Sequence, residues 1–231
     1  DVYKRQDWDR PLADLSLFDD TESVRSGAMN MAIDELLMRD SVGPWLRCYG
    51  WECETISIGH FAPVPLTLSP CVPVIRRWTG GGAVTHGGVG DATFALGIPR
   101  QHPASAMRPK HSYRWLHRAL QAALVEIGVE STLAADEVIS KEGSGGCFQN
   151  PVAADLLSTS RRKIAGGAQR RSRHGMLHQG SIQGVRLTSE FPSVFAAQLA
   201  DSWQSCSIDP GLLRRAEELA RTKYRPLESP D

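Results

Sequence analysis

The sequence predicts an α+β domain in which a mixed, mainly antiparallel sheet is flanked by helices. The predicted elements run helix, several strands, helix, several strands and two closing helices, without the strict βαβ alternation of a doubly wound nucleotide-binding fold. Glycine and proline number 21 and 14, which indicates a loop-rich domain and not a helical bundle. We expect residues 7–231 to form a single domain and treat residues 1–6, which lack an initial Met, as a candidate non-native leader.

The helices are predicted from apolar residues that recur at steps of three or four. Within 26–40, Met29, Ile33 and Leu36 form such a stripe, and Ser26 is a residue type suited to cap the N-terminus of a helix. The remaining helices are expected over about 112–127, where Gly128 ends the pattern, 192–203 and 210–223.

Short runs between glycines and prolines predict the strands. They cover residues 45–49, 55–58, 74–77, 93–98, 154–158, 163–170 and 176–183. Cys48 lies inside the first of these runs, which is apolar, so its thiol is expected to pack in the core.

Charge and cysteine content exclude several functions. The 26 basic and 26 acidic side chains cancel, so the chain lacks the long-range field that drives non-specific binding to nucleic acid or to an anionic membrane. The five cysteines form no C-x-x-C pair and no Cys/His cluster at zinc spacing, which predicts a cytoplasmic protein without a metal site. No apolar run approaches the ~18–20 residues needed to span a bilayer.

The densest motif is Val74-Ile-Arg-Arg-Trp-Thr-Gly-Gly-Gly-Ala-Val-Thr-His86. A strand ends in Arg76 and Arg77, and three glycines then let the backbone approach a ligand closely. Backbone N–H groups beside two guanidinium groups suit a phosphate or a carboxylate. The alternative is a hairpin turn whose glycines only satisfy backbone geometry. Neither a Walker A loop nor a dinucleotide fingerprint is present, because G-K-[ST] and G-x-G-x-x-G are both missing.

Three more residues are candidates for a site. Lys163 borders small residues within the basic segment 161–173, which is either a place where backbone and ligand come close or a solvated strand edge. His178 lies in the alternating segment 174–182, where the alternative is a hydrogen-bonded histidine of a half-buried strand. Cys147 lies in a glycine-rich loop, where a cation such as Lys163 or His178 would activate its thiolate.

Five motifs, taken in order, resemble one family. They are Asn30-Met-Ala-Ile-Asp-Glu-Leu36, Ile56-Ser-Ile-Gly-His-Phe61, Arg76-Arg-Trp-Thr-Gly-Gly-Gly-Ala-Val84, Lys163-Ile-Ala-Gly-Gly-Ala-Gln-Arg170 and Leu177-His-Gln-Gly-Ser-Ile182. Together they resemble the catalytic domain of the lipoate-protein ligase, octanoyltransferase and biotin ligase superfamily, in its lipoate-type branch, over roughly residues 12–225. The resemblance implies the α+β fold of class II synthetase and biotin ligase catalytic domains.

The resemblance also implies the site residues. In that family the arginine-pair glycine loop lines an acyl-binding pocket, and the strand lysine lies beside the reacting carbonyl. Catalytic roles are implied for Cys147 and Lys163. Substrate-binding roles are implied for Arg76, Arg77, Gly80, Gly81, Gly82, Ala83, His86, Gly166, Gly167, Ala168, His178 and Gly180. We therefore expect the Lys163 amine to face a narrow apolar channel and not solvent.

The order of Cys147-Phe148 and Lys163, sixteen residues apart, resembles one octanoyltransferase branch. That branch forms a thioester with octanoate taken from acyl carrier protein, passes it to a lipoyl-domain lysine and needs no nucleotide. The triple glycine at 80–82 is more typical of lipoate ligases, which use ATP and Mg²⁺. A cysteine-dependent transferase is favoured, with an ATP-dependent ligase and a non-catalytic acyl-binding homologue as alternatives.

Overall fold

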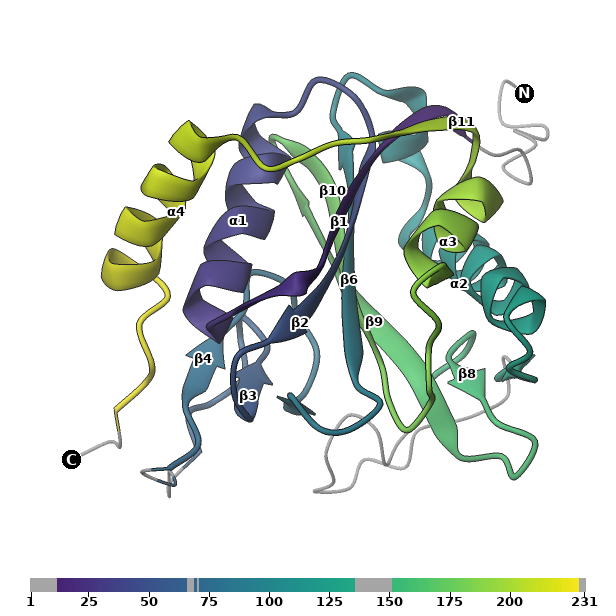
Figure 1. Ribbon diagram of the computed structural model, residues 1–231, viewed down its shortest axis with the longest axis horizontal. Helices are drawn as coiled ribbons and strands as arrows, with labels where there is room; N and C mark the ends of the chain where they lie inside the picture. The colour runs from purple at the N-terminus through teal and green to yellow at the C-terminus, as the bar shows by residue number, and fades with distance from the viewer. Residues whose placement is uncertain (1–11, 66–68, 70, 136–150, 229–231) are drawn as a thin grey trace.

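The computed structural model describes residues 12–65, 69, 71–135 and 151–228 (Figure 1). In chain order the elements are β1 (Leu12–Arg25), α1 (Gly27–Asp40), β2 (Trp45–Trp51), β3 (Thr55–Ile58), β4 (Val74–Arg76), β5 (Val84–His86), β6 (Ala92–Pro99), a 3-10 helix η1 (Pro103–Ala106), α2 (Pro109–Glu126), β7 (Thr132–Leu133), β8 (Leu156–Leu157), β9 (Lys163–Ser172), β10 (Gly175–Ile182), α3 (Phe191–Leu199), β11 (Ala200–Ser205) and α4 (Pro210–Thr222).

Two sheets organise these elements. The larger has eight strands in the order β11-β1-β2-β6-β10-β9-β8-β7, and the smaller has three in the order β4-β3-β5. In the larger sheet, β1 pairs in parallel with β11 and β2, and every other described pair is antiparallel. The predicted α+β class with a mixed, mainly antiparallel sheet is therefore confirmed.

The helices cover both faces of the large sheet. Figure 1 shows α1 and α4 together on one side and α2 and α3 together on the other. A hydrophobic core lies on each face of the large sheet, and β2 contributes side chains to both because successive residues of a strand point to opposite faces. Leu46 and Cys48 face α2 and α3, whereas Trp45 and Tyr49 face α1. The prediction that Cys48 packs in the core is confirmed.

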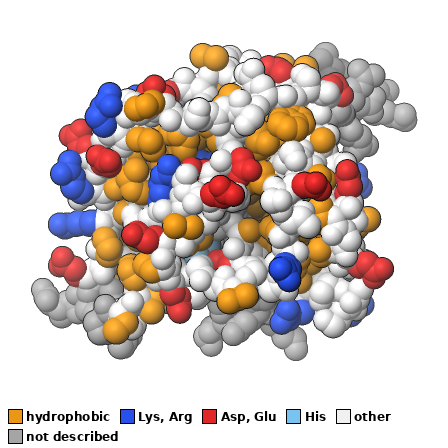
Figure 2. Space-filling view, in the orientation of Figure 1, with side chains coloured by type: hydrophobic (Ala, Val, Ile, Leu, Met, Phe, Trp, Pro, Cys, Tyr) orange, Lys and Arg blue, Asp and Glu red, His pale blue; other side chains and the backbone are white. Residues whose placement is uncertain are grey.

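The surface carries charges of both signs. Figure 2 shows Asp and Glu side chains interspersed with Lys and Arg over the face seen in Figure 1, and neither sign covers that face alone. None of the helices in the described ranges is both long enough and apolar enough to cross a membrane.

Local signals at helix ends account for two predicted boundaries. The Ser26 side chain caps α1 by accepting a hydrogen bond from the Met29 N–H, as predicted. Gly128 follows the end of α2 with φ of +83°, a left-handed conformation that glycine adopts without strain. Helix α2 starts three residues before the predicted position, since Pro109 occupies its first turn, where a missing N–H costs nothing.

One helix prediction is partly wrong. The expected helix at 192–203 ends at Leu199, and the chain continues directly as β11. Strand β11 pairs in parallel with β1 at the sheet edge, with Leu12 opposite Ala200. After Ala200 the strand is exposed, so it carries no alternating apolar pattern that the sequence could reveal. The long strand β1 was missed as well, although its partner β2 was predicted.

Candidate active site

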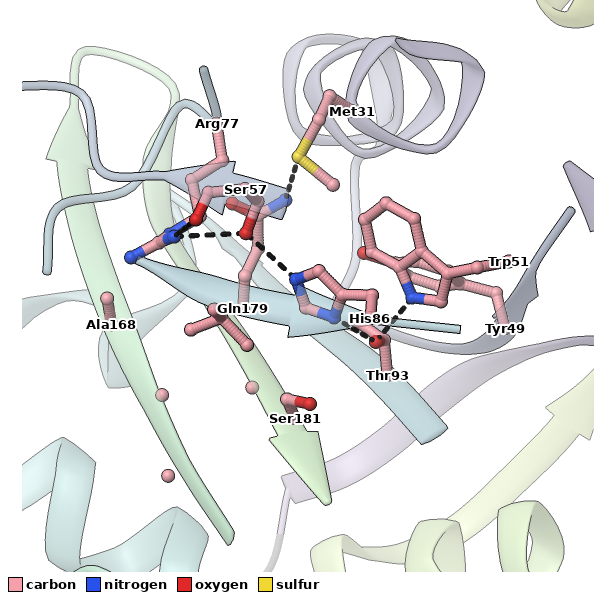
Figure 3. Close-up of a pocket in the computed structure, with 14 residues that line it drawn as sticks. Met31, Tyr49, Trp51, Ser57, Arg77, His86, Thr93, Ala168, Gln179 and Ser181 are labelled. Carbon is pink, nitrogen blue, oxygen red and sulfur yellow. Dashed lines mark hydrogen bonds between the residues drawn. The ribbon is translucent and has the colours of Figure 1, made fainter. Parts of the chain in front are cut away.

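A narrow cavity of about 40 Å³ lies between the small sheet and the middle of the large sheet (Figure 3). Its wall is formed by α1, β2, β3, β5, β6, β9 and β10 and the segment that follows β4. The lining residues are Met31, Tyr49, Trp51, Ser57, Arg77, Val84, His86, Thr93, Gly166, Gly167, Ala168, Gln179, Gly180 and Ser181. Six of them belong to the predicted set: Arg77, His86, Gly166, Gly167, Ala168 and Gly180.

Small residues of β9 and β10 form one wall because larger ones would not fit. A Cβ atom at Gly166 would collide with the Lys163 side chain, and one at Gly167 would collide with the ring of His178. At Gly180 the added atom would meet the Phe94 ring. Glycine is therefore required at these three positions by the neighbouring side chains, and the absence of a Cβ atom keeps this wall close-fitting.

Lys163 lies inside the protein, with only 2% of its side chain exposed. Its Nζ atom is 2.8 Å from Oδ2 of Asp155, a carboxylate with no exposed surface. The pair occupies the space that a side chain at Gly166, one of the glycines lining the pocket, would fill. The amine is turned away from solvent, as expected, but Lys163 is not among the residues that line the pocket, so the expectation that it faces the channel is not met in this structure.

The two arginines of the glycine motif bind backbone carbonyls. Arg77 donates to the carbonyl oxygens of Gly80 and Gly82, each at 2.7 Å, and to that of Ser57 at 2.9 Å. The loop is thereby held against β3, and Gly81 adopts φ of +87° within it. Arg77 itself reaches the pocket, which makes it both a support of the loop and part of the wall.

Arg76 points in another direction. Its Nη1 donates to the carbonyl oxygens of Gly59, His60 and Ala62, so it organises the turn after β3. The lining set does not include Arg76, nor Gly80, Gly81, Gly82 and Ala83, which are half-buried or exposed.

His86 closes one end of the pocket. Its ring stacks on Trp51 with centroids 4.0 Å apart, and its Nε2 lies 2.8 Å from Ser57 Oγ. Arg77 also contacts this hydroxyl, at 3.0 Å, and a guanidinium group only donates. The Ser57 hydroxyl therefore accepts from Arg77 and donates to Nε2, which leaves the imidazole proton on Nδ1, facing Asp91 at 3.7 Å.

The electrostatics at this end favour neutral His86. Burial, assisted by the nearby Arg77 charge, lowers the pKa of His86 to about 3. Burial also raises the pKa of Asp91 to about 6, against hydrogen bonds from the Gly87 N–H and the Ser181 hydroxyl that act in the opposite direction. The imidazole is thus uncharged at neutral pH, and the contact with Asp91 is not an ion pair.

His178 lies on the opposite face of β10 from the pocket. It stacks on Phe94 and contacts the rings of Tyr113 and His117 on the α2 side. Burial, with a smaller contribution from His117, holds its pKa well below the usual value. The strand alternation explains this placement, since Gln179 and Ser181 point into the pocket and His178 cannot.

Gln179 is a pocket residue that the sequence interpretation missed. It donates to Asp34 Oδ2 at 2.7 Å and accepts from the Thr79 hydroxyl at 2.8 Å, so it joins α1, β10 and the glycine loop. Figure 3 shows its contact with the sulfur of Met31 in the pocket. Asp34 is fully buried, and desolvation raises its pKa although Arg47 opposes this. The period of two in 174–182 was the signal that would have found Gln179.

The predicted nucleophile cannot be placed. Cys147 lies outside the described residues, as does the rest of 136–150. Four cysteines are described, and each has a free thiol: Cys48, Cys53, Cys71 and Cys206.

The fold defines the class of protein. The chain is similar to a solved lipoate-protein ligase A bound with ATP, at a TM-score of 0.69 and 19% identity, over 92% of this chain and 95% of that one. It is also similar to a bi-partite lipoate protein ligase from Thermoplasma acidophilum, at a TM-score of 0.65 and 16% identity, over 93% and 94% of the two chains. The chain therefore has the fold of lipoate ligase catalytic domains.

Sequence comparison defines the family. Residues 26–211 match the lipoyl protein ligase A/B catalytic domain, and the chain belongs to that family. Octanoyltransferase LipM of Exiguobacterium sibiricum is 33% identical over 67% of this chain, and LipM of Carboxydothermus hydrogenoformans is 35% identical over 68%. The aligned regions span 61% of each of those relatives, about three fifths of their length. The lipoate-type resemblance expected from the motifs is confirmed.

Proposed function

We propose that this chain carries the catalytic site of a protein-lipoylation enzyme, an octanoyltransferase. It would move an octanoyl group from octanoyl-acyl carrier protein to the lysine amine of a lipoyl domain. The observation that carries this proposal is the buried Lys163 amine packed against Gly166, a glycine that opens on a narrow, largely apolar pocket. The similarity to LipM octanoyltransferases supports the transferase over the ligase.

An apolar acyl chain would gain binding free energy by entering the pocket, provided that the pocket widens. Burying about seven methylenes at ~0.8 kcal/mol each gives roughly 5–6 kcal/mol before the costs of binding. A cavity of about 40 Å³ is too narrow for such a chain as it stands, so lining side chains must move on binding. Met31 suits this role, since an unbranched thioether side chain changes conformation at little cost.

In the proposed reaction, the Cys147 thiolate attacks the carbonyl carbon of the donor thioester. The tetrahedral intermediate collapses, the carrier thiolate leaves, and octanoyl remains bound to Cys147 as a thioester. The acceptor lysine amine then attacks this thioester, the C–S bond breaks to release the cysteine thiolate, and the amide forms while the amine loses one proton to solvent. The Lys163 ammonium stabilises the negative charge that develops on the carbonyl oxygen in both steps.

We also propose the cofactors, the partners and the location of this enzyme. The transferase requires no cofactor, whereas a ligase would require ATP and Mg²⁺. Its partners are an acyl carrier protein as donor and a lipoyl-domain protein as acceptor, with no nucleic acid and no membrane. We place the reaction in the cytoplasm, where thiols such as Cys147 remain reduced.

The test is to incubate the protein with octanoyl-acyl carrier protein and measure its intact mass. We expect one octanoyl adduct on Cys147, and transfer to a lipoyl domain without ATP. Cys147→Ala abolishes both, whereas Cys53→Ala, which removes an exposed thiol elsewhere, changes neither. Full transfer by Cys147→Ala would end the cysteine mechanism.

The ATP-dependent ligase is the second candidate, favoured by the triple glycine at 80–82. It predicts pyrophosphate exchange that depends on ATP, Mg²⁺ and lipoate and survives loss of Cys147. A non-catalytic acyl-binding protein, the third candidate, would instead retain an acyl ligand through purification and modify no acceptor.

A further inference from the structure

Asp155 is the centre of a polar cluster beside the pocket. Its Oδ2 accepts from the Val152 N–H at 2.7 Å and lies 2.8 Å from Lys163 Nζ. Its Oδ1 accepts from the Tyr113 hydroxyl at 2.6 Å. Asp155 has no exposed surface, so this carboxylate is oriented from three sides by groups of three different segments.

Tyr113 ties this cluster to the pocket wall. Its hydroxyl oxygen accepts a hydrogen bond from the Gly167 N–H at 3.0 Å while it donates to Asp155. The phenol thus hydrogen-bonds to the backbone of β9 at Gly167, just past Ala165, where the pairing of β9 with β8 stops. A shift of Asp155 would therefore be transmitted to both the lysine and the small-residue wall.

The cluster is a poor device for stability alone. Removing two charges from water costs several kcal/mol per ion, and well-packed apolar residues of similar volume are commonly as stable or more stable. The Lys163–Asp155 pair nevertheless lies in the fully buried layer next to the pocket. This arrangement holds one ammonium group in a fixed direction, which a pair of apolar residues would not do.

We propose that Asp155, itself held by Tyr113 and the Val152 N–H, is a positioning residue that fixes the Lys163 ammonium at the Gly166 edge of the pocket. This inference rests on the proposed function, since it assigns Lys163 its working orientation in acyl transfer. Asp155 does not touch the substrate and acts only through the lysine.

The test is a double-mutant cycle on octanoyl transfer by the full chain. Lys163→Ala and Asp155→Asn each lower kcat roughly 100-fold and leave the KM for octanoyl-acyl carrier protein nearly unchanged. The double variant loses no more than Lys163→Ala, because Asp155 acts through the lysine. Losses that multiply in the double variant, or a folded Asp155→Asn with wild-type kcat, would overturn the inference.

Chemical rescue separates positioning from folding. Added ethylamine restores part of the activity of Lys163→Ala, because Asp155 binds the ammonium, and none in the double variant. Equal rescue of both contradicts the inference. Glu35→Gln is the matched control, since Glu35 is also a buried carboxylate paired with a lysine, and it leaves kcat unchanged. Where Asp155→Asn does not fold, Tyr113→Phe removes only the supporting hydroxyl and lowers kcat roughly tenfold.

A labelling experiment decides the inference even where no octanoyl transfer occurs and the proposed function fails. Trace acetic anhydride at neutral pH is followed by peptide mass spectrometry. Acetylation of Lys163 rises roughly tenfold in Asp155→Asn, because the amine is no longer held in place by the Asp155 carboxylate and can approach the reagent. Acetylation of Lys223 stays constant. Unchanged labelling of Lys163 would show that Asp155 does not control the amine.

Discussion

Two buried carboxylates of this protein, Asp155 and Glu35, each meet a lysine, but only one of the two pairs is sealed from water. Neither carboxylate is exposed, yet Lys223, the partner of Glu35, is 39% exposed, whereas Lys163 is 2% exposed. Glu35 also contacts Arg39 and the hydroxyl of Tyr224. The comparison teaches that the same kind of ion pair occurs in two settings: Lys223, which follows α4, pairs with α1 where water reaches the ammonium, whereas Lys163 is paired where water does not.

The largest expected effect is on stability at the sealed pair. Lys163→Met leaves Asp155 as a buried charge whose ion-pair partner has been removed, so the free energy of unfolding falls by about 3–5 kcal/mol. Denaturant unfolding measures the loss. Adding Asp155→Leu to the same chain recovers most of it, and a double variant as unstable as the single one contradicts this account.

The second largest effect on stability is expected at Gly167, in the small-residue wall of the pocket beside the Lys163–Asp155 pair. Gly167→Ala drives a Cβ atom into the His178 ring, and we expect a loss of about 3 kcal/mol in the free energy of unfolding. Gly80→Ala is the control, because a Cβ atom at Gly80 meets nothing within 4 Å. Thermal melting of both variants tests the prediction, which fails if they melt alike.

His86 and Asp91 lie close together like the two ion pairs, but His86 is uncharged at neutral pH. The dependence of stability on pH tests this difference. The folded pKa of His86 is about 3, against 6.5 for an unperturbed histidine, so the unfolded state binds the proton first as pH falls. Stability linked to His86 is full above pH 6.5 and is lost down to about pH 3. His86→Gln should remove on the order of 2 kcal/mol of the stability lost between pH 7 and pH 5.

Asp91 acts in the opposite sense, which gives the control. Its pKa is raised from 3.8 to about 6, so stability linked to Asp91 falls as pH rises between those values. Asp91→Asn therefore steepens the loss of stability on acidification, whereas His86→Gln makes it shallower. Denaturant unfolding at several pH values distinguishes the two, and equal slopes would show that neither shift is present.

The smallest effect is expected at the exposed pair. Lys223→Met lowers the free energy of unfolding by about 1 kcal/mol or less, since the Lys223 ammonium is already partly exposed to water and Arg39 and Tyr224 still contact Glu35. Acyl transfer stays at the wild-type rate. A loss as large as that of Lys163→Met would remove the distinction between the two pairs.

Much of the fold was predictable because its signals are local. The cap of Ser26, the glycine after α2 and the run at 55–58, which is β3 without change, depend on neighbouring residues only. Strand β11 was mistaken for helix because its pairing partner, β1, lies at the other end of the chain. The exposed edge position also removes the alternation that would identify β11 as a strand.

The site was predictable in part for a similar reason. Gly166, Gly167 and Ala168 are small, and motif order was enough to bring them to the pocket. Asp155 was missed because its role depends on Lys163 and Tyr113, which come from β9 and α2. Gln169 and Gln179 are the same residue type, and the sequence alone does not show which face of the sheet each one occupies. In the structure Gln169 faces α2 and Gln179 faces the pocket.

The pairing of β11 with β1 has a consequence for how the molecule is made. Leu12 finds its partner Ala200 only after almost the entire described polypeptide has left the ribosome. Contacts this distant in sequence form slowly, because a long loop must close before they stabilise anything. Until then β1 has an open edge, which is where a newly synthesised chain is most exposed to pairing with its neighbours.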